Sequence, residues 1–173
     1  MLLETLAERY RLRVRQHGDF TARLVLVLLE AVTGRLFVPT AVPKLLSANR
    51  QAENLARLYL TTARHLFQLP AVALPVVIQD DTERIAQALR TAQGKGAGSI
   101  ERLARSEPLQ SAQKALSRGL EATDQRWTRH TGPSACPDCR RLADGQPLPA
   151  SVAMAIPHPS CSCVQRFIPE ETR

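Results

Sequence analysis

The amino-acid sequence predicts a mainly α-helical protein, with a helical body of about five to six helices and a small, loop-rich C-terminal module that binds zinc. Alanine and leucine dominate the 173 residues and aromatic residues make up only 4%, a bias typical of helices rather than β-sandwiches or barrels. Apolar residues recur at spacings of three and four through the helical body, as on one face of a helix. All four cysteines lie in a proline-rich C-terminal stretch that is unable to form a long helix.

The first fifty residues predict two helices followed by an irregular connection. Residues 2–16 place apolar side chains at spacings of three and four with arginines between them, which favours a surface helix. Gly18 should interrupt this helix, and Asp19 can cap a second helix that runs to about Thr33. Residues 37–43 contain two prolines and are predicted to form an irregular connection.

Two helices are predicted in the middle of the chain. A long helix should start at Ser47 or Asn49 and run through Leu69, because apolar residues again follow a helical spacing. A shorter helix should follow Asp80 and Glu83, whose separation of three residues is that of a capping box.

The glycine-rich residues 94–98 are predicted to form a loop and a candidate hinge. They do not make a phosphate-binding loop, because the G-x-x-x-x-G-K-[ST] order is absent. Ser99 can cap another helix, which Pro108 is expected to kink or divide. Residues 121–130 are also predicted to be helical.

The net charge of +7 and the pI of about 9.9 permit contact with a polyanion such as DNA. The basic residues are spread along the chain, so the sequence gives no support for a base-reading site. Arginines at 9, 11, 13 and 15 stand where a secretory signal would be apolar, and the apolar run 24–29 is too short for a membrane span. We therefore expect a reducing cytoplasm, where clustered cysteines more often hold a metal than form disulfides.

From residue 132 onward the character of the chain changes, because prolines become frequent. We therefore divide the chain into a helical body at 1–131 and a Cys/His zinc-knuckle-like module with its tail at 132–173. The module contains a C-x2-C pair, then eighteen residues, then an H-x2-C-x-C group. A C-x2-C loop turns two thiolates toward one metal, and a second loop can complete a tetrahedron. The pattern predicts a structural Zn²⁺ site, since four protein ligands leave no open position for water.

Five candidate ligands compete for the four positions around this metal: Cys136, Cys139, His158, Cys161 and Cys163. Cys161 and Cys163 would face opposite sides of an extended segment, so one of them can be a spectator. We favour Cys136, Cys139 and His158 with one of those two cysteines. An all-cysteine set with His158 as a hydrogen-bond partner remains an alternative.

The same residues allow other interpretations than a zinc site. Reduced structural thiols or two disulfides are the simpler alternative. A Cys/His nucleophile pair is weakly supported, because metal-ligand spacing is an unusual setting for one activated thiolate, and we expect the chain not to be an enzyme. Next to His130, the cluster of Arg126, Trp127 and Arg129 is interpreted as a core-anchoring tryptophan with solvated arginines rather than a contact surface for DNA or protein.

Three groups of residues carry a resemblance to a known family. They are Arg126-Trp-Thr-Arg, then Cys136-Pro-Asp-Cys139-Arg-Arg-Leu-Ala-Asp-Gly145, then Pro157-His-Pro-Ser-Cys-Ser-Cys163. Together they resemble the C-terminal signature of the Mu F-like minor head proteins, also called phage head morphogenesis proteins. The resemblance covers the C-terminal segment, whereas the N-terminal region agrees only in its helical character.

The resemblance implies a structural virion component of a tailed, double-stranded DNA phage, present in few copies inside the head or near the portal. Its partners would be the portal or the major capsid protein, and its basic residues would be suited to non-specific contact with packaged DNA. It would assist head assembly or genome packaging and ejection, passing through the host cytoplasm during assembly. The alternative function is a zinc-stabilised nucleic-acid-binding regulator or adaptor.

Overall fold

The computed structural model describes residues 2–32, 34–74, 80–133, 135–144, 146–152, 161 and 163–169, and these are mostly helical. Within these residues the chain forms five α-helices, one 3-10 turn and two short strands. In chain order they are α1 (Leu2–Ala31), η1 (Gly34–Leu36), α2 (Phe37–Leu66), α3 (Thr82–Gln93), α4 (Ala97–Ala122), β1 (Trp127–His130), α5 (Pro137–Ala143) and β2 (Val164–Phe167).

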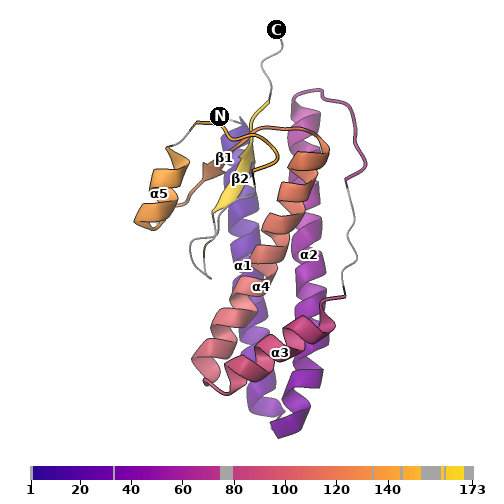
Figure 1. The fold of residues 1–173 in the computed structure, drawn as a ribbon, viewed down its shortest axis with the longest axis vertical. Coiled ribbons are helices and arrows are strands. Elements are labelled where there is room, and N and C mark those ends of the chain that lie inside the picture. The colour runs from indigo at the N-terminus through magenta and orange to yellow at the C-terminus, as the bar shows by residue number, and fades with distance from the viewer. Residues whose placement is uncertain are drawn as a thin grey trace.

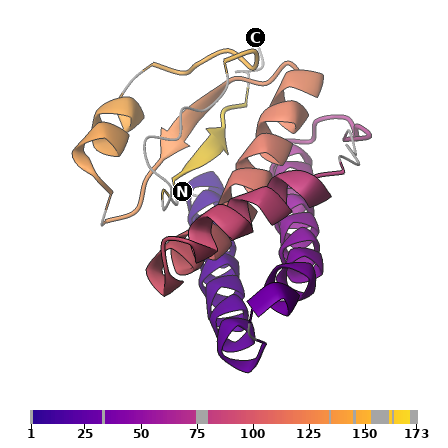
Figure 2. The same cartoon turned by 60° about the horizontal axis from the view of Figure 1, so that its bottom comes forward.

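The long helices α1, α2 and α4 lie side by side along the long axis of the molecule (Figure 1). The short α3 crosses the end of this bundle at which η1 joins α1 to α2, and it packs on α2 and α4 (Figure 2). Two groups of buried apolar side chains fill the bundle, one between α3 and the η1 end and the other toward the strands. The predicted mainly helical fold is thus confirmed. Within the described helices, none is long and apolar enough to cross a lipid bilayer.

Helix α1 runs without interruption through Gly18, so the predicted break at this glycine is wrong. The reason is packing against α4, since a Cβ atom at Gly18 would lie only 2.8 Å from the carbonyl oxygen of Arg105. Asp19 does not cap a helix, because it lies inside α1. Its carboxylate instead forms an ion pair with the Arg105 guanidinium at 2.8 Å. The glycine therefore permits the close approach of two helices rather than ending one.

Gly18→Ala should destabilise the protein, although a glycine-to-alanine substitution inside a helix usually stabilises it. Alanine normally stabilises a helical position by about 1 kcal/mol, but here overpacking against the backbone of α4 should destabilise the protein by about 1–3 kcal/mol. Gly98 is the matched control, because its added Cβ would meet nothing nearer than Arg102 Nη1 at 3.9 Å. Gly98→Ala should be neutral or stabilising by up to about 1 kcal/mol, as urea unfolding would show. Equal effects of the two substitutions would contradict the packing explanation.

Helix α2 starts at Phe37 and includes both prolines of the 37–43 segment, so the predicted irregular connection is wrong. Pro39 lies in the first turn, where backbone N–H groups have no partner within the helix and a missing N–H costs nothing. Pro43 lies in the second turn on the exposed side, where water can satisfy the carbonyl that loses its partner. The helix predicted from Ser47 or Asn49 is therefore the second part of a longer one.

The predictions for the elements after α2 are confirmed only in part. Helix α3 follows Asp80, whose Oδ1 accepts a hydrogen bond from the Thr82 N–H at 3.1 Å, and its predicted apolar face is buried. Pro108 lies inside α4 but does not divide it. The prediction that residues 121–130 are helical is wrong, because α4 ends at Ala122 and β1 begins at Trp127.

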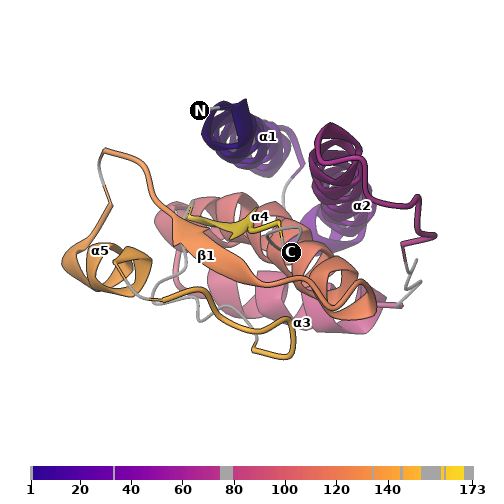
Figure 3. The same ribbon diagram turned by 90° about the horizontal axis from the view of Figure 1, so that it is seen from above.

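The two strands pair in an antiparallel ladder, with Trp127 opposite Phe167 and His130 opposite Val164. They lie against the bundle beside α4 (Figure 3), and β2 contacts both α1 and α4. Trp127, Val164 and Phe167 belong to the same buried apolar cluster as side chains of α1, α2 and α4. Residues on both sides of the predicted domain boundary at 131/132 therefore pack in one apolar cluster. The division into two domains stays a prediction.

Candidate metal centre

The C-x2-C pair is held by the start of the short helix α5. Cys136 is the N-cap residue of this helix, and Pro137 occupies the first helical position, where its fixed φ is favourable. The Cys139 N–H donates a hydrogen bond to the Cys136 sulfur at 3.4 Å. This hydrogen bond holds the Cys136 sulfur at the start of α5.

The second half of the centre comes from residues just before β2. Cys161 Sγ lies 3.4 Å from Cys139 Sγ, and the sulfurs of Cys139, Cys161 and Cys163 all lie within 4.8 Å of one another. All three side chains are buried. Thiolates around a tetrahedral zinc ion, each at about 2.3 Å from the metal, lie about 3.8 Å apart, so the observed spacing can accommodate one metal ion.

The structure brings together four of the five predicted ligands and decides one open question. Cys136 packs against the other three cysteines at the edge of the cluster. The concern that Cys161 and Cys163 would face opposite sides is not borne out, since both sulfurs lie in one group. His158 lies outside the described residues, so its predicted role as a ligand stays a prediction.

A buried arginine lies next to the cysteine cluster. The Arg129 side chain is only 6% exposed, and its Nη1 donates toward Cys139 Sγ at 3.8 Å. Its neighbour Trp127 is buried, as predicted for a core anchor, but the expectation that Arg129 is solvated is wrong. A guanidinium in low dielectric is stabilised by an adjacent anion. A metal bound by these thiolates would place such a negative charge beside Arg129.

Burial also determines the protonation of the cysteines when no metal is bound. Loss of solvation, added to the neighbouring thiols, raises the pKa of Cys139 to about 11. A hydrogen bond with Cys161, together with burial, raises the pKa of Cys163 well above its usual range. Thiols of this kind are poor nucleophiles at neutral pH. A metal ion must displace their protons, so metal uptake should release protons and weaken as the pH falls.

Polar contacts from α4 and α2 anchor the segment that carries Cys163 and β2. In α4, the Gln113 side chain donates to the Cys163 carbonyl at 2.7 Å and Ser117 donates to Gln165 at 2.7 Å. In α2, the Tyr59 hydroxyl accepts from the Phe167 N–H at 3.2 Å. These residues were not predictable as anchors, because single polar residues on a helix give no signal of a distant partner.

A further polar contact joins α1 to β1. The Glu8 carboxylate accepts two hydrogen bonds from the Arg11 guanidinium, at 2.6 and 2.8 Å. His130 Nε2 lies 2.8 Å from the same carboxylate. The bonds with Arg11 and then His130 lower the pKa of Glu8 to about 2 despite its partial burial. The end of β1 is thereby fixed to the N-terminal helix.

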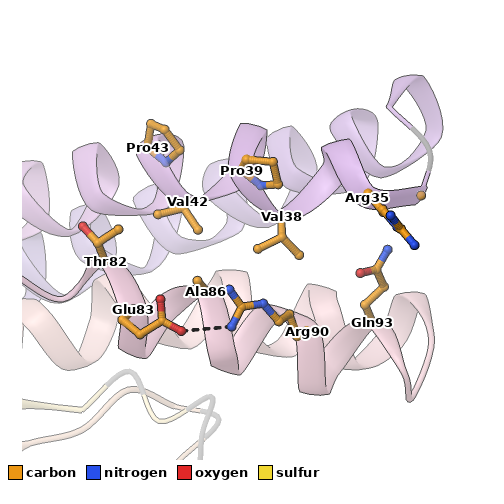
Figure 4. A pocket seen from close by; sticks show the side chains of 11 residues that line it. Arg35, Val38, Pro39, Val42, Pro43, Thr82, Glu83, Ala86, Arg90 and Gln93 are labelled. Atoms are coloured by element: carbon orange, nitrogen blue, oxygen red, sulfur yellow. Dashed lines mark hydrogen bonds and ion pairs between the residues drawn. The ribbon is translucent and has the colours of Figure 1, made fainter.

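A separate hollow of about 800 Å³ lies between α2 and α3. Figure 4 shows Val38, Val42 and Ala86 on its walls, and Glu83 paired with Arg90 at its rim. The Glu83–Arg90 ion pair measures 3.0 Å. The polar side chains of its lining are Arg35, Thr82, Glu83, Arg90 and Gln93.

The fold and the centre together define a class: a mainly helical protein with a small C-terminal cysteine cluster that can hold a metal ion. No protein-family model, curated protein or solved structure matches this chain at a significant level.

Proposed function

We propose that this chain is a structural minor head protein of a tailed, double-stranded DNA phage, with its C-terminal segment held by one Zn²⁺ ion. The observation that carries the metal part of the proposal is the convergence of three buried sulfurs within 4.8 Å. Zinc is the best fit, because thiolates in a tetrahedral arrangement favour it over magnesium or calcium. The ligands would be Cys139, Cys161 and Cys163, with Cys136 or His158 as the fourth.

The role of the metal would be structural. When bound, zinc would supply free energy that holds a short, proline-rich segment in place. That segment leads directly into β2, which contacts the helices. The assignment to the phage family is supported by the resemblance of residues 126–163 to its C-terminal signature. The cysteines of that signature are the ones that cluster here.

Cobalt substitution tests the metal centre and its fourth ligand. Co²⁺ added to the zinc-free chain should give the absorption bands of a tetrahedral thiolate complex at one equivalent. Cys136→Ser should weaken the sulfur-to-cobalt band if this cysteine is a ligand, and His158→Ala should leave it unchanged. If His158→Ala changes the cobalt spectrum and Cys136→Ser does not, His158 is the fourth ligand. A spectrum without thiolate bands would refute the metal centre.

Purified virions test the phage assignment. We propose the portal or the major capsid protein as the binding partner and the head interior or the portal region as the location. The chain should remain with particles through density-gradient purification and should cross-link to one of these two proteins. Absence from virions of a phage that encodes the chain would refute this role and favour a regulator or adaptor.

Arg129 provides a sharper prediction about the metal centre. Arg129→Met removes the positive charge beside Cys139 while keeping an apolar side chain, and should weaken zinc binding about 10–100-fold. Arg129→Lys should recover most of the affinity, because it restores the charge. The control is Arg126→Met, since Arg126 is exposed on the same segment. Competition with a chromogenic chelator measures the affinities, and equal values for Arg129→Met and the control would contradict this role.

A further inference from the structure

Helices α1 and α2 share a side of the molecule that faces away from α3 and α4 (Figure 3). Their relative position is fixed where His17 Nε2 lies 2.9 Å from the carbonyl oxygen of Ala48. Two adjoining shallow hollows of about 220 and 390 Å³ follow the seam between the helices and share Leu55 and Leu58 in their linings. This side is therefore an open surface on both helices.

Three arginines of α1 lie on this side. Arg9 and Arg13 line one of the two hollows, and Arg23 falls within the same stripe because fourteen residues bring an α-helix almost back to the same direction. All three are exposed. Lys44 of α2 is also exposed. Because α1 and α2 run in opposite directions and His17 lies beside Ala48, Lys44 lies at about the level of Arg23. We call these four residues the cationic face.

The charges on the cationic face are not neutralised within the molecule. Among the described residues, none of its four cations forms an ion pair, although many other arginines do. The acids of the same helices are directed elsewhere: Glu8 pairs with Arg11, Asp19 with Arg105, and Glu53 with Arg57. Glu30 is the acid in line with Arg23, and it lies two turns further along α1.

The spacing of these cations suits a ligand with repeated negative charges. Along α1, Arg13 lies about 6 Å beyond Arg9, and Arg23 about 15 Å beyond Arg13, at 1.5 Å per residue. Duplex DNA carries one negative charge per about 1.7 Å of its axis, so one straight duplex can meet all four cations. Guanidinium groups bind phosphate oxygens in a bidentate manner.

We propose that the cationic face of α1 and α2 binds the phosphate backbone of duplex DNA without reading its sequence. The net charge of +7 favours the approach of DNA, and exposed amides such as Asn54 between the helices can donate to phosphates. A bilayer fits this surface less well, because its exposed apolar side chains are separated by arginines. The inference does not depend on the zinc centre.

Fluorescence anisotropy with two unrelated 30-base-pair duplexes tests the inference on the full-length, zinc-loaded chain. Binding should be alike for both sequences and should weaken with salt. Four phosphate contacts predict a slope of about −3.6 in a plot of log K against log salt concentration. The variant Arg9→Gln/Arg13→Gln/Arg23→Gln should lose about 100-fold in affinity near 0.1 M salt, and its slope should become shallower by about 2.7.

The matched control carries the same loss of charge away from α1 and α2, as Lys95→Gln in the turn before α4 together with Arg102→Gln and Lys114→Gln in α4, all at exposed positions. It should bind DNA within about threefold of the unaltered chain. Equal weakening of both variants, or no binding of the unaltered chain at 50 mM salt, would overturn the proposal. So would a triple-arginine variant that keeps its DNA affinity but loses binding to vesicles containing anionic lipid. Both variants should keep their bound zinc, so that a loss of DNA affinity is not caused by loss of the metal centre.

Discussion

Substituting Cys139 with serine should abolish tight zinc binding and release the C-terminal segment from the helices. Cys139 is fully buried, its sulfur contacts that of Cys161, and its N–H bonds to Cys136. A serine hydroxyl is a poor zinc ligand, and structural zinc contributes about 10–16 kcal/mol of apparent binding free energy in zinc-finger peptides. Hydrogen exchange should therefore become fast in residues 127–130 and 164–167.

The helical part of the protein should respond differently from this segment. The helices share most of their buried apolar contacts with one another, so the far-UV circular dichroism of Cys139→Ser should stay largely helical at room temperature. Chelation of zinc from the unaltered chain should give the same state, and added zinc should reverse it only in the unaltered chain. Collapse of the helices on zinc removal would instead show that helices and cysteine module form one cooperative unit.

The second large effect is expected at Phe167, where Phe167→Ala should destabilise the protein by about 3–5 kcal/mol. The Phe167 ring is fully buried, lies 5.9 Å from the Phe67 ring and packs in the cluster that includes α1, α2 and α4. Removing it leaves a cavity at the contact between β2 and the bundle. Urea unfolding, followed by helical circular dichroism and by Trp127 fluorescence, would measure the loss.

Phe20 is the matched control for this substitution. Its side chain is 63% exposed on α1, so Phe20→Ala should change the free energy of unfolding by no more than about 0.5 kcal/mol. Similar small effects of the two substitutions would mean that β2 contributes little to the core. That outcome would remove the link between the cysteine centre and the helices.

Local patterns predicted the features of this protein that depend on neighbours in sequence. The separation of Asp80 and Glu83 identified the start of α3, and Ile85 and Leu89 of this helix are buried. The C-x2-C pair and the C-x-C group identified the cysteine cluster, because ligand spacing reflects the short reach of a chain around one metal. The crowding of prolines after residue 132 argued against a long helix, and in the described part of this stretch the helix α5 has seven residues.

Features that depend on distant parts of the chain were not predictable from the same patterns. Gly18 resembles a helix breaker in sequence, yet its role is to admit the Arg105 backbone from α4. Residues 121–130 contain no proline or glycine, so only pairing with β2 makes Trp127–His130 a strand. Arg129 was expected in solvent because most arginines are exposed, but the cysteine cluster beside it provides a place for a buried cation.

The metal content of the purified chain tests the central claim most directly. Protein prepared without chelators and analysed by inductively coupled plasma mass spectrometry should contain one zinc ion per chain, and Cys139→Ser should contain almost none. The unaltered protein should also show slow hydrogen exchange in β1 and β2. Unaltered protein with the same slow exchange but no bound transition metal would contradict the claim that a metal ion holds its C-terminal segment in place.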